Sequence, residues 1–178
     1  MYGAVTAQIT KIIAIPAPPP SAPAKVTAIY PSASLLPENQ LRFYLHFSAP
    51  MRKGEVYDHV KLFKAGGEQV TRAFLEIGEE LWDTTGTRLT LLFDPGRVKQ
   101  GLKPREEFGP VLVPGQEYKL VIDNAWRDAT GQPLAASFEK RFKAGPMTDA
   151  AIDYKKWRIE PPAAGTREPL VLRFQHGL

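Results

Sequence analysis

The chain has 178 residues, of which 43% are hydrophobic and 24% charged, values typical of a globular protein that exclude a wholly disordered chain. Its formal net charge of +4 is small and its basic and acidic residues are mixed along the chain, so charge alone gives no argument for binding nucleic acid or a membrane surface. The absence of cysteine excludes disulfides, thiol catalysis and Cys-ligated metals, and no apolar run approaches the roughly 18 residues that span a bilayer.

Residues 1–15 alternate between apolar and polar side chains, with Val5, Ala7 and Ile9 on one face, which is the period of a strand. We expect this segment to be the strand tail of a preceding unit. No signal peptide is predicted here, because no basic segment opens the chain and the apolar residues are too few. Residues 16–24, rich in proline and alanine, predict a semi-rigid linker of extended polyproline II type.

Residues 25–145 follow a period of two almost throughout, which predicts seven short strands, at 26–30, 41–47, 60–62, 70–75, 89–93, 118–122 and 134–142. In the first strand Val26, Ala28 and Tyr30 are expected to share one face. Gly66 and Gly67 indicate a hairpin turn, and residues 54–59 could form one turn of helix. The pattern predicts an all-β fold, an immunoglobulin-like antiparallel β-sandwich. Its predicted core includes Phe43, Leu45, Leu91, Tyr118, Leu120 and Phe138.

Two short motifs in this segment have structural explanations. In Phe47–Met51 (FSAPM), Pro50 ends the strand because it lacks an amide donor, and Met51 is predicted to turn inward and plug one end of the sandwich. Tyr118 follows a long connection at the start of a strand. A tyrosine corner is expected there, with the ring inside and the hydroxyl bonded to nearby backbone.

With Leu36–Asn39 before it and the Asp128–Gly131 turn after it, the FSAPM motif resembles the bacterial Ig-like domains of surface-layer and other exported proteins. The resemblance covers residues 25–145 and includes Pro114-Gly115 ahead of Tyr118. It implies an Ig-like sandwich without catalytic residues, in an extracellular, periplasmic or cell-surface protein. The function that it implies is that of a structural spacer, scaffold or adhesion module, and not of an enzyme.

Residues 146–178 repeat the opening of the central segment. Ile29–Pro31 aligns with Ile159–Pro161, and the next apolar positions, Phe43, Leu45 and Phe47, align with Leu170, Leu172 and Phe174. We expect 146–178 to be the opening strands of a second, truncated Ig-like unit in a longer tandem array, with neighbouring Ig-like domains as partners. Two strands cannot bury an apolar face alone, so these groups are predicted to lack a full partner sheet.

The sequence singles out no catalytic, metal or cofactor site. The three histidines, His46, His59 and His176, lack metal-ligand spacing, no Gly-x-Ser-x-Gly elbow occurs, and the carboxylates near turns fit turn chemistry.

An alternative function is that of a carbohydrate-binding sandwich. Trp82 or Trp126, if exposed, could stack on sugar rings. The long connection 94–116 beside them carries a candidate basic surface for an acidic cell-surface glycan or a protein, formed by Arg97, Lys99, Lys103 and Arg105.

Overall fold

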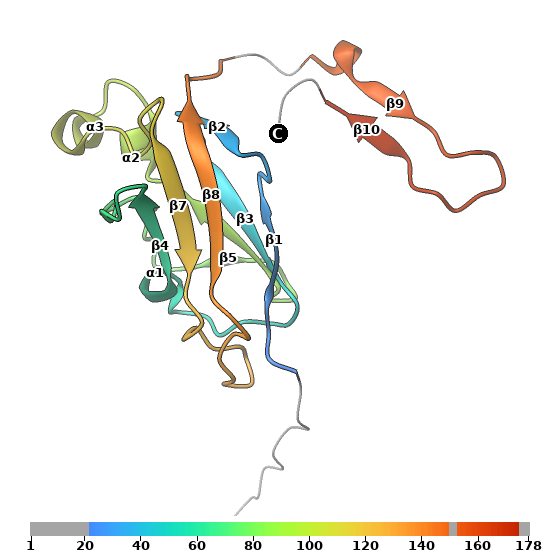
Figure 1. Cartoon of the computed structure of the whole chain (residues 1–178), viewed down its shortest axis with the longest axis horizontal. Coiled ribbons are helices and arrows are strands. Elements are labelled where there is room, and N and C mark those ends of the chain that lie inside the picture. Colours follow the sequence, from blue (N-terminus) through green and yellow to red (C-terminus); the bar gives the residue numbers. More distant parts are fainter. Residues whose placement is uncertain (1–21, 150–152, 175–178) are drawn as a thin grey trace, which may run out of the picture.

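The protein is described from a computed structural model over residues 22–149 and 153–174. Two four-stranded sheets pack face to face in this structure (Figure 1). One sheet has the strand order β1(Val26–Tyr30), β3(Arg42–Phe47), β6(Arg88–Leu92), β5(Leu81–Trp82). The other has the order β2(Leu35–Pro37), β8(Phe138–Gly145), β7(Glu117–Ile122), β4(Val60–Lys64). The predicted all-β sandwich is confirmed.

The strand order is that of the immunoglobulin fold. Taken in chain order, one sheet holds the A, B, E and D strands and the other holds C, F and G. The first strand is shared between the sheets, because β1 pairs with β3 in one and β2 pairs in parallel with β8 in the other. The remaining pairs are antiparallel.

The core lies between the two sheets and follows from the alternation of the strands. Phe43 faces Leu91 across β3 and β6, and Tyr118 faces Phe142 across β7 and β8. Phe43, Leu45 and Leu120 are completely buried. Of the six predicted core residues, five are buried and Phe138 is half-buried against the same cluster.

The first strand departs from the expected alternation. A register irregularity between Val26 and Ala28 shifts the parity of β1, so Ile29 is buried and Tyr30 is 49% exposed. The expectation that Val26, Ala28 and Tyr30 share one face is therefore wrong. A bulge adds one residue to a strand and moves every later side chain to the opposite face.

Residues 70–75 were expected to form a strand, but they do not pair with a neighbouring strand in a continuous hydrogen-bonded ladder. One single bridge, Phe63 to Gln69, lies just before the segment, and another, Phe74 to Phe93, lies within it. Arg72 has φ +52°, which interrupts the extended backbone that a strand needs. The segment still contributes to the core through Val70, Ala73 and Phe74.

The ends of the sandwich are closed as the motifs predict. Met51 is buried and bridges to Asp128. The Tyr118 ring is buried, and its hydroxyl accepts a hydrogen bond of 2.8 Å from the Val113 amide, which confirms the tyrosine corner. The predicted helical turn is α1(Val56–His59), and Gly67, with φ +87°, lies in the turn after β4.

The remaining elements are short. The connection after β6 contains α2(Pro95–Val98) and α3(Lys103–Phe108). Beyond the sandwich, the 3₁₀ turn η1(Tyr154–Lys156) precedes an antiparallel hairpin of β9(Arg158–Glu160) and β10(Val171–Arg173). The expected strand at 1–15 lies outside the described residues. Of the expected linker, residues 22–24 are described, and the carbonyl of buried Ala24 accepts the Ala135 amide at 2.8 Å.

Candidate functional site

The connection 94–116 does not present the four cations expected of it. Arg97 is only 5% exposed. Its guanidinium donates to five backbone carbonyls at 2.6–3.3 Å, those of Thr71, Arg72, Phe108, Gly109 and Pro110. Burial lowers the pKa of this guanidinium. Arg97 is therefore an internal brace that ties the connection to residues 71–72.

Arg105 also acts inside the fold. It pairs with Glu38 and donates to the carbonyls of Arg97 and Val98. Both members of the Arg105–Glu38 pair are less than one-fifth exposed. Lys99 and Lys103 do lie at the surface. The expected basic patch is thus reduced to two lysines, because Arg97 and Arg105 bond to backbone carbonyls, and Arg105 also to Glu38, inside the fold.

The two candidate tryptophans meet in one aromatic cluster at an end of the sandwich. Trp126 is completely buried, and its indole N–H donates to the Arg52 carbonyl at 3.1 Å. Trp82 is half-buried, and its indole N–H donates to Glu80 at 2.7 Å. Phe47 contacts both rings. Trp126 leaves no ring face free for a sugar, which corrects the expectation that it could stack on one.

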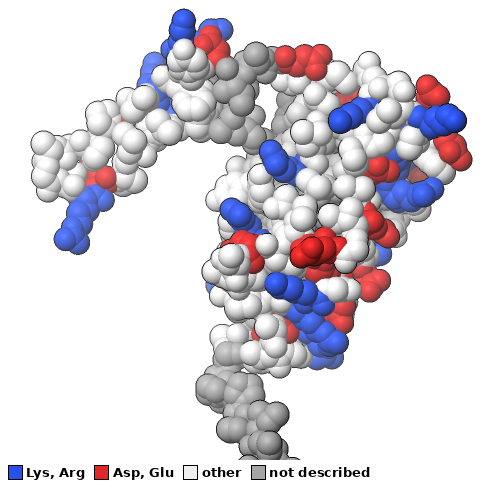
Figure 2. Space-filling model, turned by 180° about the vertical axis from the view of Figure 1, so that it is seen from behind, with Lys and Arg blue, Asp and Glu red and all other residues white. Residues whose placement is uncertain are grey.

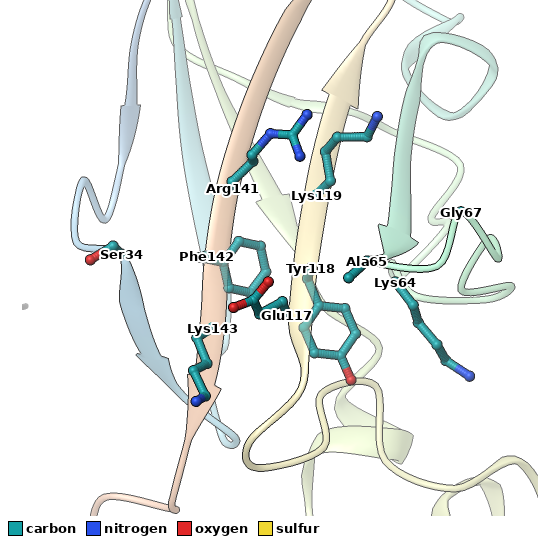
Figure 3. A pocket seen from close by; sticks show the side chains of 10 residues that line it. All are labelled: Ser34, Lys64, Ala65, Gly67, Glu117, Tyr118, Lys119, Arg141, Phe142 and Lys143. Atoms are coloured by element: carbon teal, nitrogen blue, oxygen red, sulfur yellow. The ribbon is translucent and has the colours of Figure 1, made fainter.

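A surface hollow that the sequence reading did not single out lies on the sheet of β2, β8, β7 and β4. Its volume is about 410 Å³, and Figure 3 shows its lining residues. Outward positions of β7 and β8 supply four charged side chains, Glu117, Lys119, Arg141 and Lys143. We refer to this feature as the outer hollow. The rest of its lining is formed by Ser34, Lys64, Ala65, Gly67, Tyr118 and Phe142.

The charges beside the outer hollow are partly compensated. Glu139 accepts from Lys119 at 2.9 Å and from Arg141 at 3.0 Å. The bond from Lys119 is the main cause of the lowered pKa of Glu139. Lys143 stands directly across from Glu117 in the β7–β8 register. Exposed ion pairs are weak. These lysine and arginine side chains could therefore leave their glutamate partners at little cost in free energy and bind a ligand's carboxylate or sulfate group.

One aromatic ring lies on the same outer face. Phe63 of β4 stands directly across from Lys119 of β7, and the ammonium is 6.0 Å from the centre of the ring. The ring is half-buried. The arrangement therefore combines an aromatic surface with neighbouring cations, a combination suited to an acidic sugar. The alternation of 117–122 and 138–145 places Lys119, Arg141 and Lys143 on the outer face, so this signal was present in the sequence.

The face seen in Figure 2 also carries charges of both signs. Lysine and arginine side chains lie beside aspartate and glutamate, without a wide region of one sign in this view. Mixed charge of this kind gives weak long-range attraction for a charged partner.

The remaining titratable side chains hold turns and ends. His59 bonds to Asp123 at 3.1 Å and stacks on the Trp126 ring. The carboxylate of Asp128 accepts from the amides of Thr130 and Gln132. Within residues 22–149 and 153–174, no three His, Asp or Glu side chains gather as metal ligands. None of the helices in these ranges is long and apolar enough to cross a bilayer.

Comparison with known proteins finds distant structural similarity and nothing closer in sequence. No family model matches the chain, and no curated protein matches it. A cryo-EM structure of Escherichia coli alpha-2-macroglobulin in its native conformation is similar, with a TM-score of 0.41 and 10% sequence identity. The match covers 70% of this chain, and this chain spans about 6% of that protein's length. The fold assignment rests on the strand order and register described above.

Proposed function

We propose that the chain is a non-catalytic Ig-like module that serves as a spacer or scaffold unit among neighbouring Ig-like domains of an exported bacterial protein. One observation carries the proposal: three side chains of the kind used in binding or catalysis make structural contacts within the fold. Arg97 braces a connection, Trp126 fills an end of the core, and Asp128 holds a turn. The exported location rests on the resemblance of the FSAPM and Asp128–Gly131 motifs.

The spacer role is tested by pulling single molecules from residues 22 and 149 with an optical trap. A spacer should resist tension as one unit, so residues 26–145 should unfold in one step that releases about 400 Å of chain, at 3.3–3.6 Å per residue. Gradual lengthening at low force, or several small steps, would contradict the proposal. Truncating Leu45 to Ala serves as a destabilised control that should unfold at lower force.

A second candidate function has support from the outer hollow. An acidic glycan would find Lys119, Arg141 and Lys143 in the hollow for its anionic groups, and Phe63, next to Lys119 on the same outer face, for ring contact. This site replaces Trp82 or Trp126 in the carbohydrate-binding hypothesis, because Trp126 is buried and half-buried Trp82 packs against Phe47 and Trp126. The adhesion role that the family resemblance implies would then act through this face.

The glycan hypothesis is tested by calorimetry with a uronic-acid oligosaccharide and its uncharged, carboxyl-reduced form. Lys119→Ser with Arg141→Ser should abolish binding of the acidic sugar. Lys99→Ser with Lys103→Ser removes the same charge from the surface of the connection and should leave binding intact. Equal losses in the two double variants, or no binding by the unaltered protein, would exclude the outer hollow as a glycan site.

A further inference from the structure

The β9–β10 hairpin has one apolar and one charged face. Ile159 and Leu172 are direct cross-strand partners, and the Trp157 and Phe174 rings meet on the same face at 4.9 Å. On the other face Arg173 donates to Glu160 at 2.8 Å. The apolar face is not covered by the described part of the chain, since Ile159 is 61% and Leu172 41% exposed.

The hairpin reproduces the register of β1 and β3. In the sandwich Ile29 pairs with Leu45, and in the hairpin Ile159 pairs with Leu172. These are the residues that the sequence alignment makes equivalent. The flanking pairs agree as well: Tyr30 with Tyr44 matches Glu160 with Val171, and Ala28 with His46 matches Arg158 with Arg173. Three consecutive pairs in the aligned register indicate a repeated structural unit.

The sandwich shows what covers such a pair of strands. Ile29, Leu45 and Phe47 are at most 6% exposed, because the sheet of β2, β8, β7 and β4 lies over them. The inner face of that sheet is mainly aliphatic and aromatic, with Leu62, Leu120 and Phe142 among its buried residues and Lys140 as its charged member. The equivalent positions of the hairpin are also apolar, so they fit the same kind of surface.

We propose that the β9–β10 hairpin is the first strand pair of a second Ig-like sandwich, and that its apolar face docks against a sheet equivalent to β2, β8, β7 and β4. The partner is therefore a polypeptide with the alternating apolar pattern of those strands. This inference rests on the tandem organisation in the proposed function. Closure of a sandwich removes the exposed apolar face that would otherwise favour association.

The inference is tested by supplying β4, β7 and β8, the three strands of that sheet that follow β3 in the chain. Residues 48–145 of this chain are appended after Phe174, so that β4 to β8 follow the hairpin as they follow β3. Hydrogen exchange at 158–160 and 171–173 should slow by more than about tenfold relative to the unextended chain, because amides in packed strands exchange only through larger openings. In the extended chain Leu172→Lys should remove this protection. Val171→Lys, a matched change on the opposite face, should keep it.

A positive control is needed to interpret a hairpin that stays unprotected in the extended chain. In a plain tandem duplicate, residues 1–155 are followed by 26–145, so a genuine β1–β3 pair precedes the added strands. If the duplicate folds twice and the hairpin of the extended chain stays unprotected, the inference is wrong. The pulling experiment above concerns residues 26–145 alone, so the spacer proposal can fail or stand separately.

A second measurement needs no added strands. In the 178-residue chain a hydrophobic dye should bind the open face of the hairpin, and Leu172→Lys should reduce this binding much more than Val171→Lys. Equal dye binding by all three proteins would overturn the inference. A stable dimer in sedimentation that Leu172→Lys dissociates would assign the face to a second copy of the chain and would also overturn it.

Discussion

Arg97 connects residues 71–72 with residues 108–110 through its five carbonyl contacts, and its replacement is the sharpest residue-scale test of the fold. Arg97→Met keeps the apolar stem and leaves five backbone carbonyls without their charged donor. We expect a loss of about 3 kcal/mol or more in the free energy of unfolding, measured by denaturant titration. Lys99→Met, at the surface of the same connection, should change the value by less than about 0.5 kcal/mol. Similar effects of the two substitutions would contradict the role of Arg97.

Asp128 makes the stability of the sandwich dependent on pH. Burial raises its pKa, but hydrogen bonds from Thr130, Gln132 and Gly131 outweigh burial and lower the pKa below the ordinary value of 3.8. A carboxylate with a depressed pKa in the folded state stabilises the protein above its unfolded pKa. This contribution is lost as the pH falls through the lower, folded pKa.

We therefore expect the free energy of unfolding to fall as the pH drops below about 4, with a smaller fall in Asp128→Asn. Urea titrations between pH 2.5 and 7 measure both curves. The pKa of Asp83 is lowered as well, and this surface carboxylate accepts hydrogen bonds from the amides of Thr87 and Arg88. Asp83→Asn is therefore the matched variant with which the pH dependence of Asp128→Asn is compared. An acid limb that is unchanged in Asp128→Asn would show that other carboxylates account for the pH dependence.

At the scale of the elements, β3 is one of the strands that form the centre of the sandwich. It is central in its sheet and contributes three buried side chains, Phe43, Leu45 and Phe47. Leu45→Ala should cost roughly 2–5 kcal/mol in the free energy of unfolding, from lost burial and the cavity left behind. Tyr44→Ala, on the outer face of the same strand, is the control. A loss below about 1 kcal/mol for Leu45→Ala would mean that the inner face has been assigned wrongly.

Alternation and turn residues were enough to predict most strands, the sandwich class and the positions of Met51 and Tyr118. They failed at β1 because a bulge changes parity without changing composition, and at 70–75 because the positive φ of Arg72 leaves no mark in the hydrophobic pattern. The two-residue strand β5 and the three-residue strand β2 are too short for a period to be recognised.

The basic residues of the long connection illustrate a different limit. From the sequence alone, Arg97 and Arg105 are expected at the surface, since arginine is mostly exposed in proteins. Their burial follows from the path of the folded connection, whose carbonyls turn toward them. Lys140 is a similar case: it occupies an inward position of β8, and its ammonium donates to the carbonyls of Ser32 and Ala33. Its pKa is lowered by burial.

For the whole molecule, the sandwich should fold independently of the hairpin. We expect truncation after Asp149 to leave the melting transition of residues 25–145 nearly unchanged and to increase solubility. The cut retains Thr148, which exchanges two hydrogen bonds with Asn39 at 2.9 and 3.1 Å. Thermal scans by circular dichroism measure the transition. If truncation unfolds the sandwich, the hairpin belongs to one larger fold and the tandem interpretation fails.

Metal removal is expected to have no effect on folding. The Asp128 carboxylate is already satisfied by amide and hydroxyl donors from Thr130 and Gln132, and the core is apolar. Excess EDTA should leave the melting temperature unchanged in the same scans. A clear decrease, reversed by added Ca²⁺, would show that carboxylates near the turns bind a structural ion.

The division of the first strand between the two sheets bears on how the molecule responds to tension. β2 and β8 are parallel neighbours, joined by bonds such as Lys143 N–H to the Ser34 carbonyl and Glu38 N–H to the Gly145 carbonyl. The chain enters the sandwich through the first strand and leaves through β8. Pulling its ends therefore slides these strands past each other along their length. The inter-strand bonds are then loaded together in shear instead of opening one after another, and the pair acts as a mechanical clamp.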